Sequence, residues 1–385
     1  MRIVHIITRL IVGGAQENTL LSCEGQHAQG HEVTLITGPS LGPEGSLMER
    51  AQKGGYRVEV IDEMRRSILP MKDLQTYRVL KNRLQELKPQ VVHTHSSKAG
   101  IIGRWAAHRA EIPAVIHTIH GLAFTASKSA SVNAFYRFLE RKTAPISTSI
   151  VCVADAMRDQ SLAANIGRPE QYVTVYSGME TDPFLHPPIA REQVRHSLGL
   201  QPEHIVVGTI ARLFHMKGHE DLLAAALRLC GEFQNLRFLW VGDGILRAQF
   251  EQSIAAMNLK DRFILTGLVP PSQIPQLTSA MDILAHPSRR EGLARALAQG
   301  GLAGKPVVTY DIDGNREGLI DGKSGFLISP FDTSAFADRL HQLLDDESLR
   351  RNMGETGRQF ALGRFSASVM VSALQQVYDS ALKKK

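Results

Sequence analysis

The sequence predicts an α/β protein with two doubly wound, Rossmann-like domains. Short segments rich in β-branched residues alternate with longer segments of helical pattern, which is typical of parallel sheets wound by helices. The short segments are apolar nearly throughout, as expected for strands covered on both faces. With 385 residues, 43% of them hydrophobic and 21% charged, the chain is long enough for two cores of common domain size.

The first domain is predicted over residues 1–185 and the second over residues 186–364. The turn residues Ser177, Gly178 and Pro183 indicate the boundary. Residues 365–385 show helical periodicity, and we expect a C-terminal helix that packs back on the first domain, the alternative being a surface helix. The expected strands are residues 2–8, 32–37, 57–61, 91–94, 114–117, 149–153 and 172–176 in the first domain, and 205–210, 237–241, 262–266, 282–286 and 306–311 in the second.

Composition predicts a cytoplasmic protein. The apolar N-terminus is interrupted by Arg9 and ends at Gly13, well before the roughly 20 residues of a spanning helix. Any membrane contact is therefore expected to be peripheral, at the inner face of the membrane. Three cysteines without metal-ligand spacing are expected to be reduced core residues; they are Cys23, Cys152 and Cys230.

A net charge of +6 suits anionic partners. No zinc-finger spacing or RNP-like run occurs, so no nucleic-acid partner is expected. The segment 134–142, AFYRFLERK, mixes aromatic and basic residues. It could touch an anionic membrane, but aromatic residues at helical spacing are more often core.

The strongest chemical pattern follows the expected strand 205–210. Arg212 offers a planar fork for phosphate oxygens, and Lys217 adds a second cation beside the start of a helix. A turn from strand to helix is where ligands bind in open α/β sheets. These residues predict a diphosphate site, with two solvated surface charges as the alternative.

The expected strand 282–286 ends at a second polar turn. Glu291 can accept hydrogen bonds from sugar hydroxyls, and Gly292 allows a backbone to approach a ligand closely. Gln299, eight residues after Glu291, is expected on the same face of the helix that follows, so that the two could span a sugar and a ribose.

In the first domain, His120 closes a strand before Gly121 at the expected ligand edge. His93 and His95 end another strand and are equally well explained as structural histidines. Gly13 and Gly14 open a helix, but no GxGxxG pattern follows the first strand, which argues against an oxidoreductase.

Together these segments resemble the family 4 retaining glycosyltransferases, whose fold is GT-B, with two Rossmann-like domains facing across a cleft. The resemblance covers essentially the whole chain and depends on the order and spacing of several motifs. They are Gly13-Gly-Ala-Gln16, His95-Ser-Ser-Lys98-Ala-Gly100, His120-Gly121, residues 208–218, Val241-Gly-Asp-Gly244 and Glu291-Gly-Leu-Ala-Arg-Ala-Leu-Ala-Gln299.

The resemblance implies transfer of a sugar from a nucleoside-diphosphate sugar to a hydroxyl of a glycan or lipid-linked glycan, as in envelope polysaccharide and lipopolysaccharide synthesis. It implies retention of configuration, no cofactor and no metal ion. The implied catalytic residues are His120, Arg212, Lys217 and Glu291. The implied donor-binding residues are Gly14, Gly242, Gly244, Leu268, Val269, Gly292, Leu293, Ala294 and Gln299, and Gln16, His95 and Lys98 are candidates on the acceptor side.

Two positions depart from the family pattern. Gln299 stands where the family's second glutamate usually binds ribose, and it has no charge to strengthen that contact. Ala294 replaces a frequent glycine. Asp311-Ile-Asp313 follows a strand, but its context matches a loop of the family rather than a metal site. A nucleotide-sugar 2-epimerase on the same fold and a non-catalytic nucleotide-sugar-binding module are the alternative functions.

Overall fold

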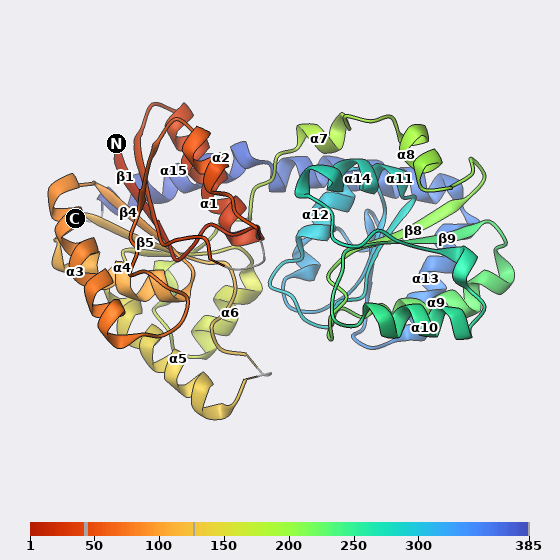
Figure 1. Ribbon diagram of the computed structural model, residues 1–385, viewed down its shortest axis with the longest axis horizontal. Coiled ribbons are helices and arrows are strands. Elements are labelled where there is room, and N and C mark those ends of the chain that lie inside the picture. The colour runs from red at the N-terminus through yellow and green to blue at the C-terminus, as the bar shows by residue number, and fades with distance from the viewer. Residues whose placement is uncertain (42–44, 126–127, 384–385) are drawn as a thin grey trace. The chain divides into compact units, whose positions relative to one another are not determined.

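The computed structural model describes residues 1–41, 45–125 and 128–383, so residues 384–385 of the expected C-terminal helix lie outside it. It divides into two compact units, one of residues 1–179 with 367–385 and one of residues 180–366 (Figure 1). Each unit is a parallel sheet with helices on its faces, and the predicted α/β class is confirmed.

The first unit contains a seven-stranded parallel sheet of order β3-β2-β1-β4-β5-β6-β7. The strand order reverses between β1 and β4, where His5 pairs with His93. This reversal is the switch point at which open α/β sheets bind ligands, beyond the carboxyl ends of the strands. The strands are β1 (Arg2–Ile7), β2 (Glu32–Thr37), β3 (Arg57–Val60), β4 (Val91–His95), β5 (Ala114–Ile119), β6 (Ser149–Cys152) and β7 (Tyr172–Thr174).

Helices cover both faces of this sheet. Ile3 and Val91 pack against the C-terminal helix α15, whereas their chain neighbours Val4 and Val92 pack against residues of α3 and α4. Successive strand residues point to opposite faces, which is why the strands read as continuous apolar runs. The helices are α1 (Gly14–Ala28), α2 (Met48–Lys53), α3 (Pro70–Leu87), α4 (Ser97–Arg109), α5 (Ala130–Thr143), α6 (Asp155–Ala163) and α15 (Ala367–Lys383), with the short 3-10 turns η1 (Ala144–Ile146) and η2 (Pro169–Gln171).

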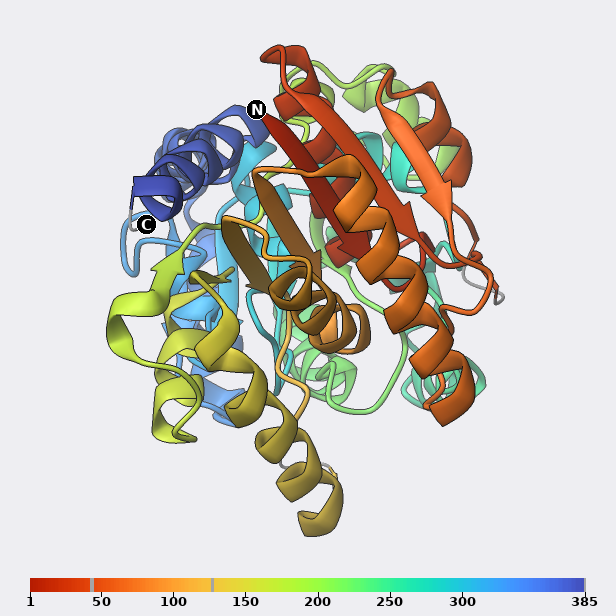
Figure 2. The same cartoon turned by 90° about the vertical axis from the view of Figure 1, so that its left-hand side faces the viewer.

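The C-terminal helix completes the core of the first unit. It lies beside the N-terminal strand in both views (Figures 1 and 2). Met370, Leu374 and Tyr378 of α15 are almost completely buried against the sheet. The helix is attached at its start as well, because the amide of Ala367 donates to the carbonyl of Met179 over 3.0 Å.

The second unit contains a six-stranded parallel sheet of order β10-β9-β8-β11-β12-β13, whose switch point lies between β8 and β11. Its strands are β8 (Ile205–Ile210), β9 (Leu236–Val241), β10 (Phe263–Leu265), β11 (Ile283–His286), β12 (Val307–Tyr310) and β13 (Gly325–Ile328). Its helices are α7 (Asp182–Leu185), α8 (Arg191–Ser197), α9 (His219–Glu232), α10 (Arg247–Ala256), α11 (Ile274–Ala280), α12 (Arg295–Leu302), α13 (Thr333–Asp345) and α14 (Glu347–Phe365), with the 3-10 turns η3 (Lys260–Arg262), η4 (Pro271–Gln273) and η5 (Asn315–Glu317).

The structure adds details that the sequence pattern did not predict. The edge strand β13 is not among the expected strands, since its four residues directly follow a turn. The units divide after Met179 rather than after residue 185, because α7 packs on α11 and α12 of the second unit. The C-terminal helix begins at Ala367, because Ser366 has an extended backbone that interrupts α14 and α15.

Candidate functional site

Three loops meet at the carboxyl ends of β8, β9 and β11 in the second unit. The β8 loop contains Arg212 and Lys217, and the β11 loop contains Glu291. The amide of Arg289 donates to the carbonyl of Met216 over 2.8 Å, which joins the first loop to the last. The switch point therefore brings together three of the four predicted catalytic residues.

Glycine permits this close approach of the loops. Gly218, the residue before α9, has φ of 74°, and a Cβ there would lie 1.9 Å from the carbonyl oxygen of Pro287 in the β11 loop. Gly242 has φ of 142°, and its Cβ would lie 2.2 Å from the carbonyl oxygen of Ala211. Both positions combine a left-handed backbone with a contact that no side chain fits.

Glu291 is the centre of a mostly buried charged cluster. Its Oε1 accepts hydrogen bonds from Lys217 Nζ at 2.5 Å and from His286 Nε2 at 3.1 Å. Burial alone would raise its pKa, but the His286 hydrogen bond and the charges of His286 and Lys217 outweigh burial and lower the pKa to about 2. At neutral pH this carboxylate is ionised and is a hydrogen-bond acceptor for hydroxyl groups.

Arg212 is an exposed residue of the β8 loop, and its guanidinium lies 4.9 Å from the centre of the Phe214 ring. Nearby, α9 and α12 begin after Gly218 and Ala294, and their first amides have no partner within the helix. Two cations and two helix N-termini are an arrangement that stabilises phosphate groups.

The predicted position of Gln299 relative to Glu291 was wrong. Glu291 belongs to the loop before α12, and Gln299 lies about one turn into that helix, so the two do not share a helical face. Gly292 accepts from the amide of Gly314 over 2.9 Å, which fixes the loop away from helical geometry. Leu293 is half-buried in this loop, and Ala294 is buried.

The remaining donor-side candidates line the neighbouring β9 and β10 loops. Gly242 pairs with Gly267 in an isolated antiparallel bridge, which brings the segment of Leu268 and Val269 close to it. Gly244 also approaches backbone, because a Cβ there would lie 2.3 Å from the carbonyl oxygen of Leu213. The side chain of Leu268 is 83% exposed, whereas Val269 packs against the core.

In the first unit, the candidates gather at the carboxyl ends of β1, β4 and β5. Gly14 is the first residue of α1, and the side-chain oxygen of Gln16 lies over Gly13. His95 and His120 are in direct contact, with Nδ1 of His95 3.0 Å from Nε2 of His120. Lys98 is held away from them, since its Nζ binds Asp73 at 2.5 Å and the carbonyl of Ser67.

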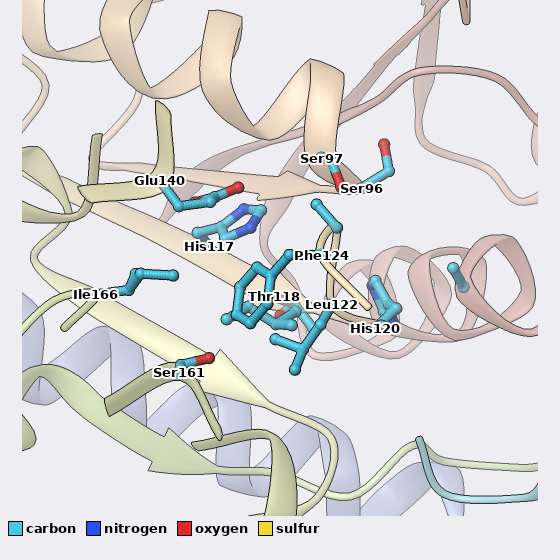
Figure 3. Close-up of a pocket in the computed structure, with 14 residues that line it drawn as sticks. Ser96, Ser97, His117, Thr118, His120, Leu122, Phe124, Glu140, Ser161 and Ile166 are labelled. Carbon is cyan, nitrogen blue, oxygen red and sulfur yellow. The ribbon is translucent and has the colours of Figure 1, made fainter. Parts of the chain in front are cut away.

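A pocket of about 290 Å³ opens beside His120 (Figure 3). Its lining is largely apolar and includes Leu122, Phe124 and Ile166. Glu140 also lines it and forms an ion pair of 2.7 Å with the fully buried Arg104. This pocket lies entirely within the first unit and was not predicted, because its walls come from residues distant in sequence.

The sequence reasoning also missed the partners of these histidines. His5 is hydrogen-bonded to His95 and to Gln26. Tyr378 is hydrogen-bonded to Gln26 and to His93. His117 is hydrogen-bonded to the neighbouring Thr94. His93 and His95 are alternate residues of β4, and His5 lies on the adjacent strand β1. This spacing is the sequence signal that could have indicated the cluster.

Among the described residues, one group of three potential metal ligands occurs, formed by His5, His93 and His95 with ligand atoms within 4.8 Å of one another. Each of their ring nitrogens already has a protein hydrogen-bond partner. The Asp311 carboxylate pairs with Arg316, and Asp313 accepts from the amide of Glu291 over 3.2 Å. Both aspartates of this Asp-x-Asp sequence therefore have protein partners.

No helix in the described ranges is long and apolar enough to span a bilayer. The aromatic residues of α5 are not core residues, contrary to the more common pattern, because Phe135 is 46% and Phe138 56% exposed. Basic groups accompany them, with Lys142 Nζ 5.9 Å from the centre of the Phe138 ring.

Comparison with known proteins identifies the family. Residues 190–360 match the family described as glycosyl transferases group 1, and residues 13–178 match the glycosyl transferase 4-like domain. The chain is 28% identical over 382 residues to the UDP-Gal:alpha-D-GlcNAc-diphosphoundecaprenol alpha-1,3-galactosyltransferase of Escherichia coli, covering 98% of this chain and 96% of that protein. It is 24% identical over 347 residues to the capsular polysaccharide biosynthesis glycosyltransferase CapM of Staphylococcus aureus, covering 86% and 88%.

Solved structures share the fold. Anabaena Alr3699/HepE in complex with UDP-glucose superposes with a TM-score of 0.82 at 21% identity, covering 99% of this chain and 100% of that one. WaaG, a glycosyltransferase involved in lipopolysaccharide biosynthesis, gives 0.72 at 18% identity, covering 97% and 99%. Because the two family matches together span most of the chain and both units contain a doubly wound parallel sheet, the chain belongs to the GT-B glycosyltransferases, enzymes that use nucleotide-sugar donors.

Proposed function

We propose that this glycosyltransferase moves a hexosyl group from a nucleoside-diphosphate sugar to a hydroxyl of a lipid-linked glycan, with retention of configuration and without a metal ion. The observation that carries the proposal is the cluster of Lys217, Glu291 and His286 at the switch point of the second sheet. It places an ionised acceptor of hydroxyl groups directly beside a cation.

In this proposal, the second unit binds the donor. Arg212 and Lys217 bind the diphosphate together with the first amides of α9 and α12, and they stabilise the charge that develops on it as it leaves. Glu291 accepts hydrogen bonds from the sugar hydroxyls. The β10 loop with Leu268 and Val269 contacts the base through its backbone, and Gln299 contacts the ribose.

The reaction breaks the bond between the anomeric carbon and the phosphate oxygen and forms one to the acceptor oxygen on the same face. The proton of the acceptor hydroxyl passes to the departing phosphate oxygen. Glu291 already accepts two hydrogen bonds through Oε1 and has a strongly lowered pKa, so it suits hydroxyl binding better than covalent attack.

The first unit binds the acceptor. Its pocket beside His120 is concave and largely apolar, which suits a substrate that combines sugar and lipid parts. The Escherichia coli relative is named for an acceptor of this kind, a sugar joined through a diphosphate to undecaprenol. The exposed aromatic and basic residues of α5 support contact with an anionic membrane surface that holds such a lipid.

Thermal stabilisation by a panel of nucleoside diphosphates and their sugars tests this proposal. A ligand at 100 times its Kd stabilises the folded protein by about 2.7 kcal/mol. We expect one nucleotide to raise the melting temperature of wild type, and no rise in the Arg212→Ala, Lys217→Ala double variant. An equal rise in both proteins, or none with any nucleotide, would reject the diphosphate site. Anomer analysis of the product by NMR then tests retention.

A further inference from the structure

A chain of buried hydrogen bonds runs from the C-terminal helix to His120. Gln26 Nε2 donates to the Tyr378 hydroxyl at 3.1 Å, and Gln26 Oε1 lies 2.7 Å from His5 Nε2. His5 Nδ1 lies 2.9 Å from His95 Nε2, and His95 Nδ1 lies 3.0 Å from His120 Nε2. Gln26, His5, His95 and Tyr378 are all completely buried, so their polar atoms depend on one another.

Counting donors and acceptors assigns one tautomer to each ring. An amide oxygen only accepts, so Nε2 of His5 must donate to Gln26, and the Nδ1 of a neutral His5 is then an acceptor. That acceptor requires a proton on Nε2 of His95, which leaves Nδ1 of His95 as an acceptor. His120 must therefore donate from Nε2 to His95, and the Nδ1 of a neutral His120 then has the lone pair.

The buried rings are neutral, as this counting requires. Burial lowers the pKa of His5 to about 4, although the hydrogen bond to Gln26 opposes this shift, and burial together with the neighbouring histidines lowers the pKa of His95 well below its usual range. A charged imidazole in either position would remain without a counter-ion in an apolar core.

A second series of hydrogen bonds, from Tyr378 to His93 and Thr118, is consistent with the same donor and acceptor assignment. The Tyr378 hydroxyl accepts from Gln26 and therefore donates to His93 Nδ1, which lies 2.5 Å away. His93 Nε2 then donates to the Thr118 hydroxyl at 2.6 Å. Turning the Gln26 amide by half a rotation would exchange donor and acceptor at every bond of the chain, so this one side chain sets the direction of all of them.

We propose that Gln26 and Tyr378 are positioning residues that fix the tautomer of His120 through His5 and His95. The chain makes Nδ1 the acceptor nitrogen of His120, and in the substrate complex we expect this atom to accept a hydrogen bond from a substrate hydroxyl group. It does not conduct protons out of the site, because the Gln26 amide at its far end cannot take one up. The consequence for activity depends on this contact of His120 and on the glycosyltransferase function proposed above, whereas the tautomer itself does not.

Nitrogen-15 NMR of the histidine rings tests the tautomers directly, since protonated and lone-pair nitrogens have separate chemical shifts. In full-length wild type between pH 6 and 8, we expect His5, His95 and His120 each to have the proton on Nε2. A proton on Nδ1 of His120, or a mixture of tautomers, would overturn the proposal whatever the enzyme's activity.

Two substitutions of Gln26 separate the direction of the hydrogen bonds in the chain from the folding stability of the protein. Gln26→Glu keeps an acceptor toward His5, and we expect the wild-type tautomers. Gln26→Lys offers only a donor, and we expect the proton to move to Nδ1 in His5, His95 and His120. If Gln26→Lys does not fold, Gln26→Met removes the acceptor without adding charge, and we expect His5 to lose its single tautomer. Unchanged tautomers in the Lys variant, or in the Met variant if it is used, would contradict the proposal.

Activity gives a second readout. We expect Gln26→Lys to lower kcat/KM by roughly three- to tenfold more than Gln26→Glu does, the effect of one lost hydrogen bond to the substrate. Tyr172→Phe is the matched control, because it removes one buried tyrosine hydrogen bond of 2.8 Å in the same unit without touching the chain. If the Glu and Lys variants are equally active although the Lys variant has inverted tautomers, the hydrogen-bond chain sets the tautomer of His120 as proposed. The proposed contact of His120 with the substrate would then be rejected. No activity in wild type toward any donor would reject the proposed function and leave the tautomer result standing.

Discussion

Nζ of Lys217 lies 2.5 Å from Oε1 of Glu291, so the loops after β8 and β11 are joined by an ion pair across the switch point of the second sheet. The pair is mostly buried, with side-chain exposures of 23% and 16%. Neither residue can be replaced without leaving the other charge poorly compensated.

Replacing Lys217 is expected to weaken catalysis more than binding of the nucleoside. We expect Lys217→Ala to lower kcat by about 100-fold or more, since a cation that stabilises a leaving diphosphate acts mainly in the transition state. Steady-state kinetics with the donor found by thermal stabilisation measure this. Lys260→Ala, an exposed lysine of the same unit, is the control and should leave kcat unchanged. Equal loss in both variants would refute the assignment.

Acid is expected to remove the stabilisation that the ionised Glu291 provides. The pKa of Glu291 in the folded protein, about 2, is below its ordinary value of 4.5. Its contribution is therefore complete above pH 4.5 and is lost as the pH falls toward 2, with an upper limit of about 3 kcal/mol.

The matched variant is Glu291→Gln, which does not titrate. Urea unfolding at pH 5 and pH 3 should show that wild type loses more free energy of unfolding than the variant does. A difference between the two proteins that stays constant over this range would contradict the lowered pKa.

Removing only one partner of the buried ion pair between Arg104 and Glu140 is expected to destabilise the protein strongly. Arg104→Met leaves Glu140 buried without its partner and should destabilise the protein by about 3–5 kcal/mol. The double variant Arg104→Met, Glu140→Leu should recover most of this loss. Chemical unfolding of the wild type, the two single variants and the double variant gives the coupling free energy, and additive losses would mean that the 2.7 Å contact contributes nothing specific.

Membrane contact through α5 predicts a lipid-dependent phenotype. We expect Phe135→Ser with Phe138→Ser to reduce co-sedimentation with vesicles containing anionic lipid, because two exposed rings no longer enter the interface. Leu227→Ser, which removes a comparably exposed apolar side chain from α9, is the control. If both proteins sediment like wild type, α5 is not the contact surface.

The sequence predicted most strands because buried parallel strands are short, apolar and bounded by turn residues. It missed β13, whose four residues give too little pattern. It also placed Gln299 on a shared face with Glu291, because helical spacing was assumed across a loop that Gly292 holds in another shape.

The candidate site residues that follow a strand end were predictable from the sequence, whereas the buried partners of other candidate residues were not. Arg212, Lys217 and Glu291 stand where topology alone brings ligands. The links from Tyr378 to Gln26 and from Glu140 to Arg104 join residues far apart in sequence, and only the packed structure shows them.

The return of the chain to its first unit has a consequence for synthesis. Residues 180–366 form a continuous unit that can fold as soon as it leaves the ribosome, whereas the first unit lacks α15 until the whole second unit has been made. Until then, the sheet face that later covers Met370, Leu374 and Tyr378 is open to solvent. Nascent chains of this protein should therefore depend on chaperones that shield an apolar surface at the N-terminal part while the rest is translated.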